Sequence, residues 1–278
     1  IQAGIDSVPI GGTVNVASGE YEENLEISRD LNLLGDPGAG GAGPAEEAPV
    51  VVGDGCPIIT IESGNVTVSG FFIDGDGCGD PVVRITGAEN VTITDNDIAG
   101  GDTGIYTGGS EVSFSELTIS DNRVTDNGNY GIYFDRISDG ELTISHNVVT
   151  GSGAAGIYLS GGSGGISSST VSLIDNTVSN NSRVGVYADR VEGASTLNLT
   201  HNTINGNGEG GGEGDSYAGV YINNVFGSST VAFRDNTISN NSGQGAYVCS
   251  EGECSSSTMT FEGNTVEGNG GSGLEIYS

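Results

Sequence analysis

The sequence of 278 residues predicts an all-β fold, a single parallel β-helix in which the chain winds as a solenoid with asparagine ladders at the turns. Three observations lead to this prediction. A unit of roughly 22 to 34 residues recurs along the chain, which indicates stacked repeats. Within each unit apolar residues alternate with polar ones, as they do in half-buried strands. The composition, with 50 glycines and no tryptophan, suits short strands and tight turns better than helices.

The repeat is visible in three near copies: "ISDNRVTDNGNYGIYF" from Ile119, "ISHNVVTGSGAAGIYL" from Ile144 and "LIDNTVSNNSRVGVYA" from Leu173. Aligning the copies gives a first asparagine column, which comprises Asn96, Asn122, Asn147, Asn176, Asn202, Asn236 and Asn264. A second column follows a few residues later and comprises Asn127, Asn181, Asn207, Asn241 and Asn269, with Gly101 and Ser152 in the other two copies.

Two alternating segments in each copy predict strands. "ELTISDN" precedes the first asparagine and "GIYF" follows the second, with Ile or Val facing inward and Tyr facing outward. Such short strands cannot bury their apolar faces alone, so successive coils must stack on one another. Asparagine tolerates the left-handed backbone of a turn, and stacked amides bond along the axis. We therefore interpret the asparagine columns as turn geometry, which requires no catalytic role.

We expect one β-helix domain over residues 1–278, with about nine to ten coils. Insertions interrupt the repeat near residues 36–49 and 208–216.

The opening segment "IQAGIDSVPIGGTVNVASGEYEENLEISRDLNLLGD" resembles the first coil of right-handed parallel β-helix proteins of the pectin-lyase-like superfamily, in which "IQ-AID" typically ends a capping helix. The "DN-I--N---GIY" units resemble the β-helix repeat of the same family. The resemblance implies a right-handed helix. It specifies function poorly, because this fold serves pectate lyases, polygalacturonases, epimerases, phage tailspikes, adhesins and surface proteins. Their catalytic motifs ("W-DH", "R-P--R", "GHG", "RIK", "DPH") do not occur here, so no catalytic residue can be assigned from the family.

The charge balance is extreme, with 37 acidic residues, 7 arginines, no lysine and a net charge of -30. The negative electrostatic potential of such a surface disfavours nucleic acid and anionic membranes as partners. The surface is suited either to very high salt, which screens repulsion, or to collecting divalent cations. We favour a halophile, because the acidic residues are spread along the chain and lysine is missing throughout.

The cysteines indicate an extracellular or cell-surface location. Cys249 and Cys254 flank the short loop "SEGE", and Cys56 and Cys78 lie about one repeat apart, so two disulfides, Cys56–Cys78 and Cys249–Cys254, are expected in an oxidising setting. Zinc is the alternative, although the chain has no C-x-x-C pair. No apolar run reaches the roughly 18 residues of a membrane span, so we expect no direct membrane insertion.

The residue before each first-column asparagine forms an acidic column with two histidines, namely Asp95, Asp121, His146, Asp175, His201 and Asp235. Stacking would place each histidine between two aspartates. Asp175, His201 and Asp235 are the candidates for acid–base catalysis. The alternative is a solvated column of turn residues.

The segment "DGDGCGDP" supplies Asp74, Asp76 and Asp80, and Asp54 lies one coil earlier. Aspartates separated by glycine resemble a calcium loop, so Ca²⁺ is the one cofactor we consider, but the spacing departs from the EF-hand pattern. The alternative is an acidic loop held by a disulfide.

A tyrosine recurs after the second asparagine column and gives the candidate ligand-binding set Tyr106, Tyr133, Tyr158, Tyr187, Tyr221 and Tyr247. An outward ladder of phenol rings offers the flat apolar faces that carbohydrates prefer. The alternative is that stacked aromatic rings only stiffen the sheet.

These features predict an extracellular or cell-surface module of a halophile with a binding, adhesive or structural role and a polysaccharide or cell-envelope glycan as its partner. Self-association by end-to-end stacking of coils is a further prediction. The alternative function is a polysaccharide lyase or glycoside hydrolase that acts on an acidic polysaccharide.

Overall fold

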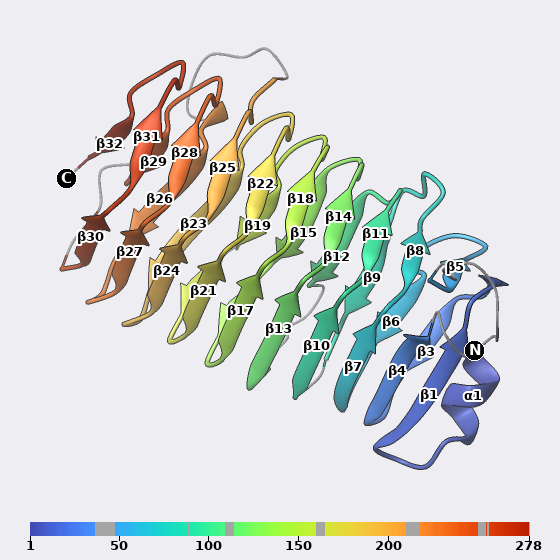
Figure 1. The fold of residues 1–278 in the computed structure, drawn as a ribbon. Helices are drawn as coiled ribbons and strands as arrows, with labels where there is room; N and C mark the ends of the chain where they lie inside the picture. The colour runs from blue at the N-terminus through green and yellow to red at the C-terminus, as the bar shows by residue number, and fades with distance from the viewer. Residues whose placement is uncertain are drawn as a thin grey trace.

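The computed structural model describes residues 1–36, 48–87, 89–108, 114–159, 165–209, 217–249, 254 and 256–277. The chain forms a solenoid of stacked coils with three parallel sheets running along its length (Figure 1). The predicted insertions fall largely on 37–47 and 210–216, which lie outside the described residues.

Each coil contributes one strand to each sheet. The first sheet contains β1 (Gly12–Ala17), β4 (Leu31–Asp36), β7 (Asn65–Ser69), β10 (Asn90–Thr94), β13 (Glu116–Ser120), β17 (Glu141–Ser145), β21 (Thr170–Ile174), β24 (Thr196–Thr200), β27 (Thr230–Arg234) and β30 (Thr258–Glu262). The second contains β2 (Glu20–Glu22), β5 (Val50–Val52), β8 (Phe72–Asp74), β11 (Asp97–Ala99), β14 (Arg123–Thr125), β18 (Val148–Thr150), β22 (Thr177–Ser179), β25 (Thr203–Asn205), β28 (Thr237–Ser239) and β31 (Thr265–Glu267).

The third sheet contains β3 (Leu25–Ile27), β6 (Ile59–Ile61), β9 (Pro81–Ile85), β12 (Thr103–Thr107), β15 (Tyr130–Phe134), β19 (Ile157–Leu159), β23 (Val186–Glu192), β26 (Val220–Val225), β29 (Ala246–Val248) and β32 (Leu274–Ile276). The short strands β16 (Ile137–Ser138) and β20 (Ile166–Ser167) extend it. Every pairing between strands is parallel and in register, as a solenoid requires; for example, Ile119 pairs with Ile144.

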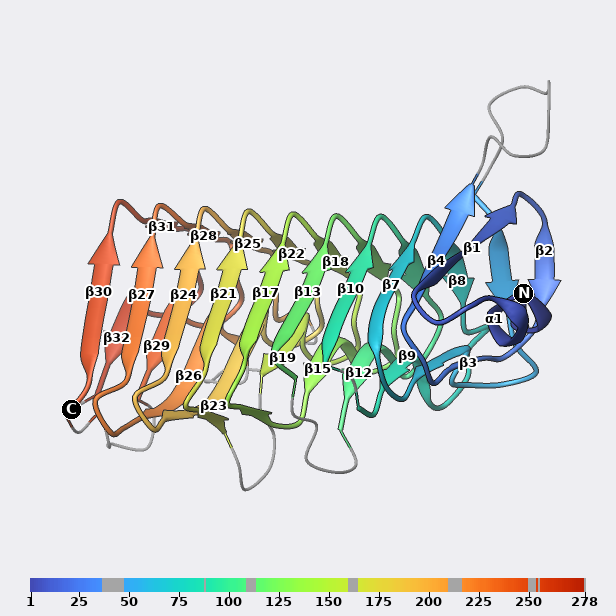
Figure 2. The same ribbon diagram turned by 90° about the horizontal axis from the view of Figure 1, so that it is seen from below.

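The core lies inside the solenoid and consists of stacked aliphatic side chains. In β13, Leu117 and Ile119 are fully buried, whereas Glu116 and Thr118 face outward, so the strand period of two separates core from surface. The same positions of the next coils are Leu142 and Ile144, also buried. At the N-terminal end the helix α1 (Gln2–Ser7) lies across the first coil (Figure 2) and buries Ile5, as the resemblance implies.

Two asparagine ladders run through the turns, which confirms the predicted ladders. Asn122 is representative: its backbone N–H and its Nδ2 both donate to Oδ1 of Asn147, at 2.9 and 3.0 Å. Nδ2 of Asn122 also donates to the carbonyl oxygen of Ile93 on the preceding coil at 2.8 Å. Oδ1 of Asn122 in turn accepts the backbone N–H of Asn96, so each rung satisfies an N–H and a carbonyl of the preceding coil and bonds the amide of the following one inside a buried turn.

The predicted reason for these asparagines was partly wrong. The left-handed residue of each turn is the one before the ladder asparagine, for example Asp121 (φ 56°), His146 (φ 57°) and Asp175 (φ 55°). The ladder asparagines do not have positive φ, and they are chosen for their buried amides. A third ladder, which the sequence reasoning missed, joins Ser169, Ser195 and Ser229: the N–H of each of the first two donates to Oγ of the next at 3.1 Å.

Both predicted disulfides, Cys56–Cys78 and Cys249–Cys254, are present, with Cα atoms 5.9 Å apart in each. The first ties a turn after β5 to a turn after β8, and the second closes a loop after β29. Within the described part of the chain, no helix has the length and apolar character needed to cross a membrane.

Candidate functional site

The outer face of the third sheet carries a continuous stack of eight tyrosine rings, which we call the tyrosine ladder. Its members are Tyr106, Tyr130, Tyr133, Tyr158, Tyr187, Tyr221, Tyr247 and Tyr277. The six predicted tyrosines occupy one register column across β12, β15, β19, β23, β26 and β29. The column continues at Glu275 in β32. The strand period explains the register column, because a buried Ile, Val or Ala precedes each of its six tyrosines and the next side chain points to the opposite face of the strand.

The rings are best aligned in the middle of the ladder. The centroids of Tyr158 and Tyr187 are 4.4 Å apart with an interplanar angle of 10°, and those of Tyr187 and Tyr221 are 5.2 Å apart with an angle of 5°. Towards the N-terminal end the rings are tilted, and Tyr130 packs between Tyr133 at 4.9 Å and Tyr158 at 5.0 Å. The middle of the ladder is therefore a nearly flat aromatic surface.

Six of the eight phenol rings are partly buried, Tyr247 is buried at 6% exposure and Tyr277 is exposed, so the ladder is less open than the sequence predicted. Ala155, Val184 and Ala218, from the turns that lead into β19, β23 and β26, pack against them. Burial is the main cause that raises the pKa of Tyr133 and of Tyr187 above that of a free phenol, and the same cause raises the pKa of Tyr158. The phenols consequently keep their protons at neutral pH and present hydroxyl groups at the surface.

Polar side chains border the rings on the side where the strands end. The Tyr133 hydroxyl donates to Oδ1 of Asp135 at 3.3 Å, and the Tyr187 hydroxyl donates to Oδ1 of Asp189 at the same distance. Nδ2 of Asn223 donates to Asp189 at 3.0 Å. These groups lie two residues after a ladder tyrosine, so the strand period brings them to the same face.

A hollow of about 280 Å³ opens beside the flat part of the ladder. It is lined by Tyr130, Ala154, Ala155, Tyr158, Arg183, Val184, Tyr187 and Tyr221. Arg183 is exposed, and it makes no ion pair with a described carboxylate. The sequence reasoning found three of the tyrosines but missed Tyr130, the small alanines and Arg183, because these residues directly precede the glycine and the apolar residue before each ladder tyrosine, at positions where the residue type differs between copies.

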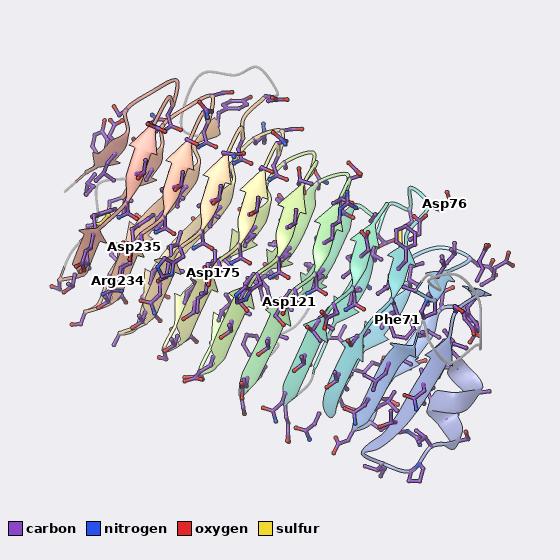
Figure 3. The ribbon with its side chains drawn as sticks, in the orientation of Figure 1. Phe71, Asp76, Asp121, Asp175, Arg234 and Asp235 are labelled. Carbon is purple, nitrogen blue, oxygen red and sulfur yellow. A yellow bond between two sulfur atoms is a disulfide. The ribbon has the colours of Figure 1, made fainter. Side chains whose placement is uncertain are left out.

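The acidic column runs along a different edge, where strands of the first sheet pass into the second. Figure 3 shows Asp121, Asp175 and Asp235 in line there. Nε2 of His146 lies 3.6 Å from Oδ2 of Asp175, and Nε2 of His201 lies 3.6 Å from Oδ2 of Asp235. The structure thus brings the candidates His201 and Asp235 together. Their side chains are 55% and 56% exposed, so water screens the interaction.

The predicted calcium residues do not form a cluster of carboxylates. Oδ1 of Asp74 accepts the backbone N–H of Asp76 at 2.9 Å, which folds the turn locally. Asp80 pairs with Arg84 at 3.3 Å, and Asp54 lies on the turn of the coil before. In the residues that the structure describes, no three His, Cys, Asp or Glu side chains lie close enough together to hold a metal ion. Calcium binding by Asp54, Asp74, Asp76 and Asp80 remains a prediction, and the described residues do not bring these carboxylates together to coordinate the ion.

The three parallel sheets, the internal aliphatic stack and the ladders define a β-helix. The family model for the right-handed β-helix region matches residues 51–171 and 166–278, so this chain belongs to the right-handed β-helix family. That result agrees with the resemblance to the pectin-lyase-like superfamily. No curated protein matched the chain, and no solved structure matched it either.

Proposed function

We propose that this chain is a binding module of the cell exterior that holds a glycan on the tyrosine ladder. The observation that carries the proposal is the flat stack of Tyr158, Tyr187 and Tyr221 beside a hollow. The C–H face of a pyranose ring packs on such an aromatic surface, and the phenol hydroxyls offer hydrogen bonds at its edge. The disulfides are compatible with an oxidising, extracellular location.

The groups around the ladder suit sugar hydroxyls. Asp135 and Asp189 are acceptors, and Asn223 supplies an amide, all on the face that carries the rings. Extended glycans advance by about one sugar ring for each coil spacing of about 4.8 Å. A glycan lying along the solenoid axis would therefore meet one phenol ring in each coil from β12 to β29 and a polar group at the coils of β15, β23 and β26, which gives repeated weak contacts.

The distribution of positive charge supports a glycan that bears carboxylate or sulfate groups. Arg84 and Arg190 lie in strands of the third sheet, while Arg136 and Arg183 flank its strands β15 and β23. Four of the seven arginines of a chain with net charge -30 thus belong to this sheet. Arg183, which is exposed at the hollow, has a guanidinium group available for a bidentate contact with an anionic sugar substituent.

Binding to immobilised uronate-containing, sulfated and neutral polysaccharides tests the proposal. Arg183→Ala should weaken retention on the anionic polysaccharides by about tenfold, as expected for one lost charge-assisted contact. Tyr158→Phe keeps the ring and should change retention less than Tyr158→Ala. Tyr277→Ala is the matched control, because Tyr277 stacks at the end of the ladder and does not line the hollow. If all these variants are retained as well as the parent, or if no polysaccharide retains the parent, the proposal is wrong.

A second candidate function is hydrolysis or elimination of a polysaccharide at the acidic column, and the contact between His201 and Asp235 favours it. An imidazole beside a carboxylate can transfer a proton to or from a substrate. Digestion of the same polysaccharides, followed by detection of reducing ends and unsaturated products, tests this function. Loss of product in His201→Ala but not in His146→Ala would support it, and the absence of product from the parent chain would refute it.

A further inference from the structure

The oxidisable side chains of this protein are concentrated in the tyrosine ladder. Eight of its 10 tyrosines belong to the ladder, and the chain has no tryptophan and a single methionine. The described cysteines are all in disulfides. An oxidant that removes one electron from this protein therefore finds phenol rings before any other readily oxidised group.

The rings are close enough together to share that oxidation. Centroid separations along the ladder range from 4.4 Å for Tyr158–Tyr187 to 5.5 Å for Tyr247–Tyr277. Electron exchange between aromatic groups falls steeply with distance and is fastest at van der Waals contact, which these stacked rings make. The ladder runs from β12 to β32, roughly 29 Å at about 4.8 Å per coil.

Proton acceptors lie where the electron would leave. A phenol that loses an electron becomes strongly acidic and releases its proton to a hydrogen-bonded base. Asp135 accepts a hydrogen bond from the Tyr133 hydroxyl, and Asp189 accepts one from the Tyr187 hydroxyl. Like any phenol, both are protonated at neutral pH, and burial, which raises the pKa of each, further disfavours the phenolate, so the proton needs such an acceptor when an electron leaves.

We propose that the tyrosine ladder carries oxidising equivalents along the solenoid to its most exposed ring, Tyr277. A one-electron oxidant takes an electron from a ladder tyrosine, whose proton passes to the neighbouring aspartate and leaves a neutral phenoxyl radical. The next phenol then supplies one electron and one proton, and becomes the radical itself. Tyr277, 46% exposed, is the ring at which a soluble one-electron reductant returns an electron and a proton.

From Tyr158 onward the ladder offers a single path, with one ring at each step. Tyr130 and Tyr133 both reach Tyr158, but Tyr187 is the ring that joins Tyr158 to Tyr221. Tyr187→Phe keeps the stacking and removes the hydroxyl, so that the ring has no proton to release with the electron. Tyr217→Phe is the matched control, since Tyr217 makes no ring contact with the ladder in the structure.

The test attaches a ruthenium bipyridyl photo-oxidant to Thr60→Cys, which lies on the same register column two coils before Tyr106. Flashes with a cobalt(III) quencher generate ruthenium(III), and a nitroso spin trap marks the radicals for peptide mapping. We expect trapped radical at Tyr277 in the labelled protein and in its Tyr217→Phe form, and loss of most of that adduct in its Tyr187→Phe form. Adducts confined to Tyr106 and Tyr133, or an unchanged Tyr277 adduct after Tyr187→Phe, would overturn the proposal.

Discussion

A missing rung in the second asparagine ladder gives the sharpest prediction for stability. Ser152 occupies the place between Asn127 and Asn181, and its backbone N–H donates to Oδ1 of Asn181 at 3.0 Å. Its own Oγ is fully buried and has no hydrogen-bond partner. In the intact rungs, for example Asn207, the side chain receives a backbone N–H, donates to the next rung and donates to a carbonyl of the preceding coil.

Ser152→Asn should restore these bonds and stabilise the protein. The new side-chain amide can accept the backbone N–H of Asn127, donate to Oδ1 of Asn181 and donate to a carbonyl oxygen of the preceding coil. The substitution also removes the buried Ser152 hydroxyl, which has no hydrogen-bond partner. Three buried hydrogen bonds at about 0.5–1.5 kcal/mol each would contribute about 1.5–4.5 kcal/mol, from which fixing the side chain subtracts about 1 kcal/mol, so we expect a gain of about 0.5–3.5 kcal/mol in the free energy of unfolding. Urea unfolding of parent and variant at one salt concentration measures this gain.

The same ladder contains a control of opposite sign. Gly101 occupies the equivalent position one coil before Asn127, but a Cβ there would lie 2.5 Å from Cγ2 of Val82 and 3.0 Å from the carbonyl oxygen of Asp80. Gly101→Asn should therefore destabilise the protein, through overpacking that typically costs about 1–3 kcal/mol. If the Ser152→Asn variant is no more stable than the parent, the ladder amides do not stabilise the protein by pairing buried backbone groups, and the reasoning is refuted.

Three further predictions concern charge and pH. The net charge of -30 should make the melting temperature rise between about 0.1 and 3 M KCl, and a flat response would contradict a halophilic surface. His201→Ala should change stability by less than about 1 kcal/mol, because its contact with Asp235 is exposed; a larger loss in thermal unfolding would show that the column supports the fold. The folded-state pKa of Tyr133 and Tyr187 is raised. The stability that these two protonated phenols contribute to the folded state is therefore fully present below the unfolded phenol pKa of about 10, and it is lost as the pH rises above that value. Ultraviolet titration should show the ladder phenols ionising only with unfolding, and free ionisation of all phenols in the folded protein would contradict the buried ladder.

Repetition made much of the fold predictable from the sequence. Each coil repeats the same alternation of apolar and polar residues and the same asparagine, so a copy that departs from the pattern can still be aligned with the others. The tyrosine column and the disulfide Cys56–Cys78 followed from the same spacing, whereas Cys249–Cys254 followed from the short loop between its two cysteines. The position of the left-handed residue did not, because Asp121 and Asn122 are adjacent and both types tolerate turns. Only the buried hydrogen bonds of Asn122 separate their roles.

The parts of the candidate site that the sequence did not reveal are positions where the residue type differs between the copies. Tyr130 and Ala155 both stand directly before the glycine that precedes a ladder tyrosine, and Arg183 stands one residue earlier in its copy, so they meet around one hollow without sharing a residue type. The serine ladder is similar, since Ser169 and Ser195 stand in turns rich in serine and glycine, where one serine looks like another. At the hollow and at the serine ladder, the role of a residue depends on whether its side chain is buried. The packing of the neighbouring coils determines that burial.

The helix α1 covers the apolar stack at the first coil, and no equivalent helix covers the last described coil. Coils touch only their neighbours, so the stability of each depends on the coil above and the coil below. At the first coil α1 covers the apolar stack, and Ile5 is 1% exposed. At the opposite end Leu274 and Ile276 are 43% and 44% exposed, and the rungs Asn264 and Asn269 are more open than those before them. In this 278-residue chain, amide hydrogen exchange should therefore be faster in β30–β32 than in the middle of the stack and in the first coil, which α1 covers.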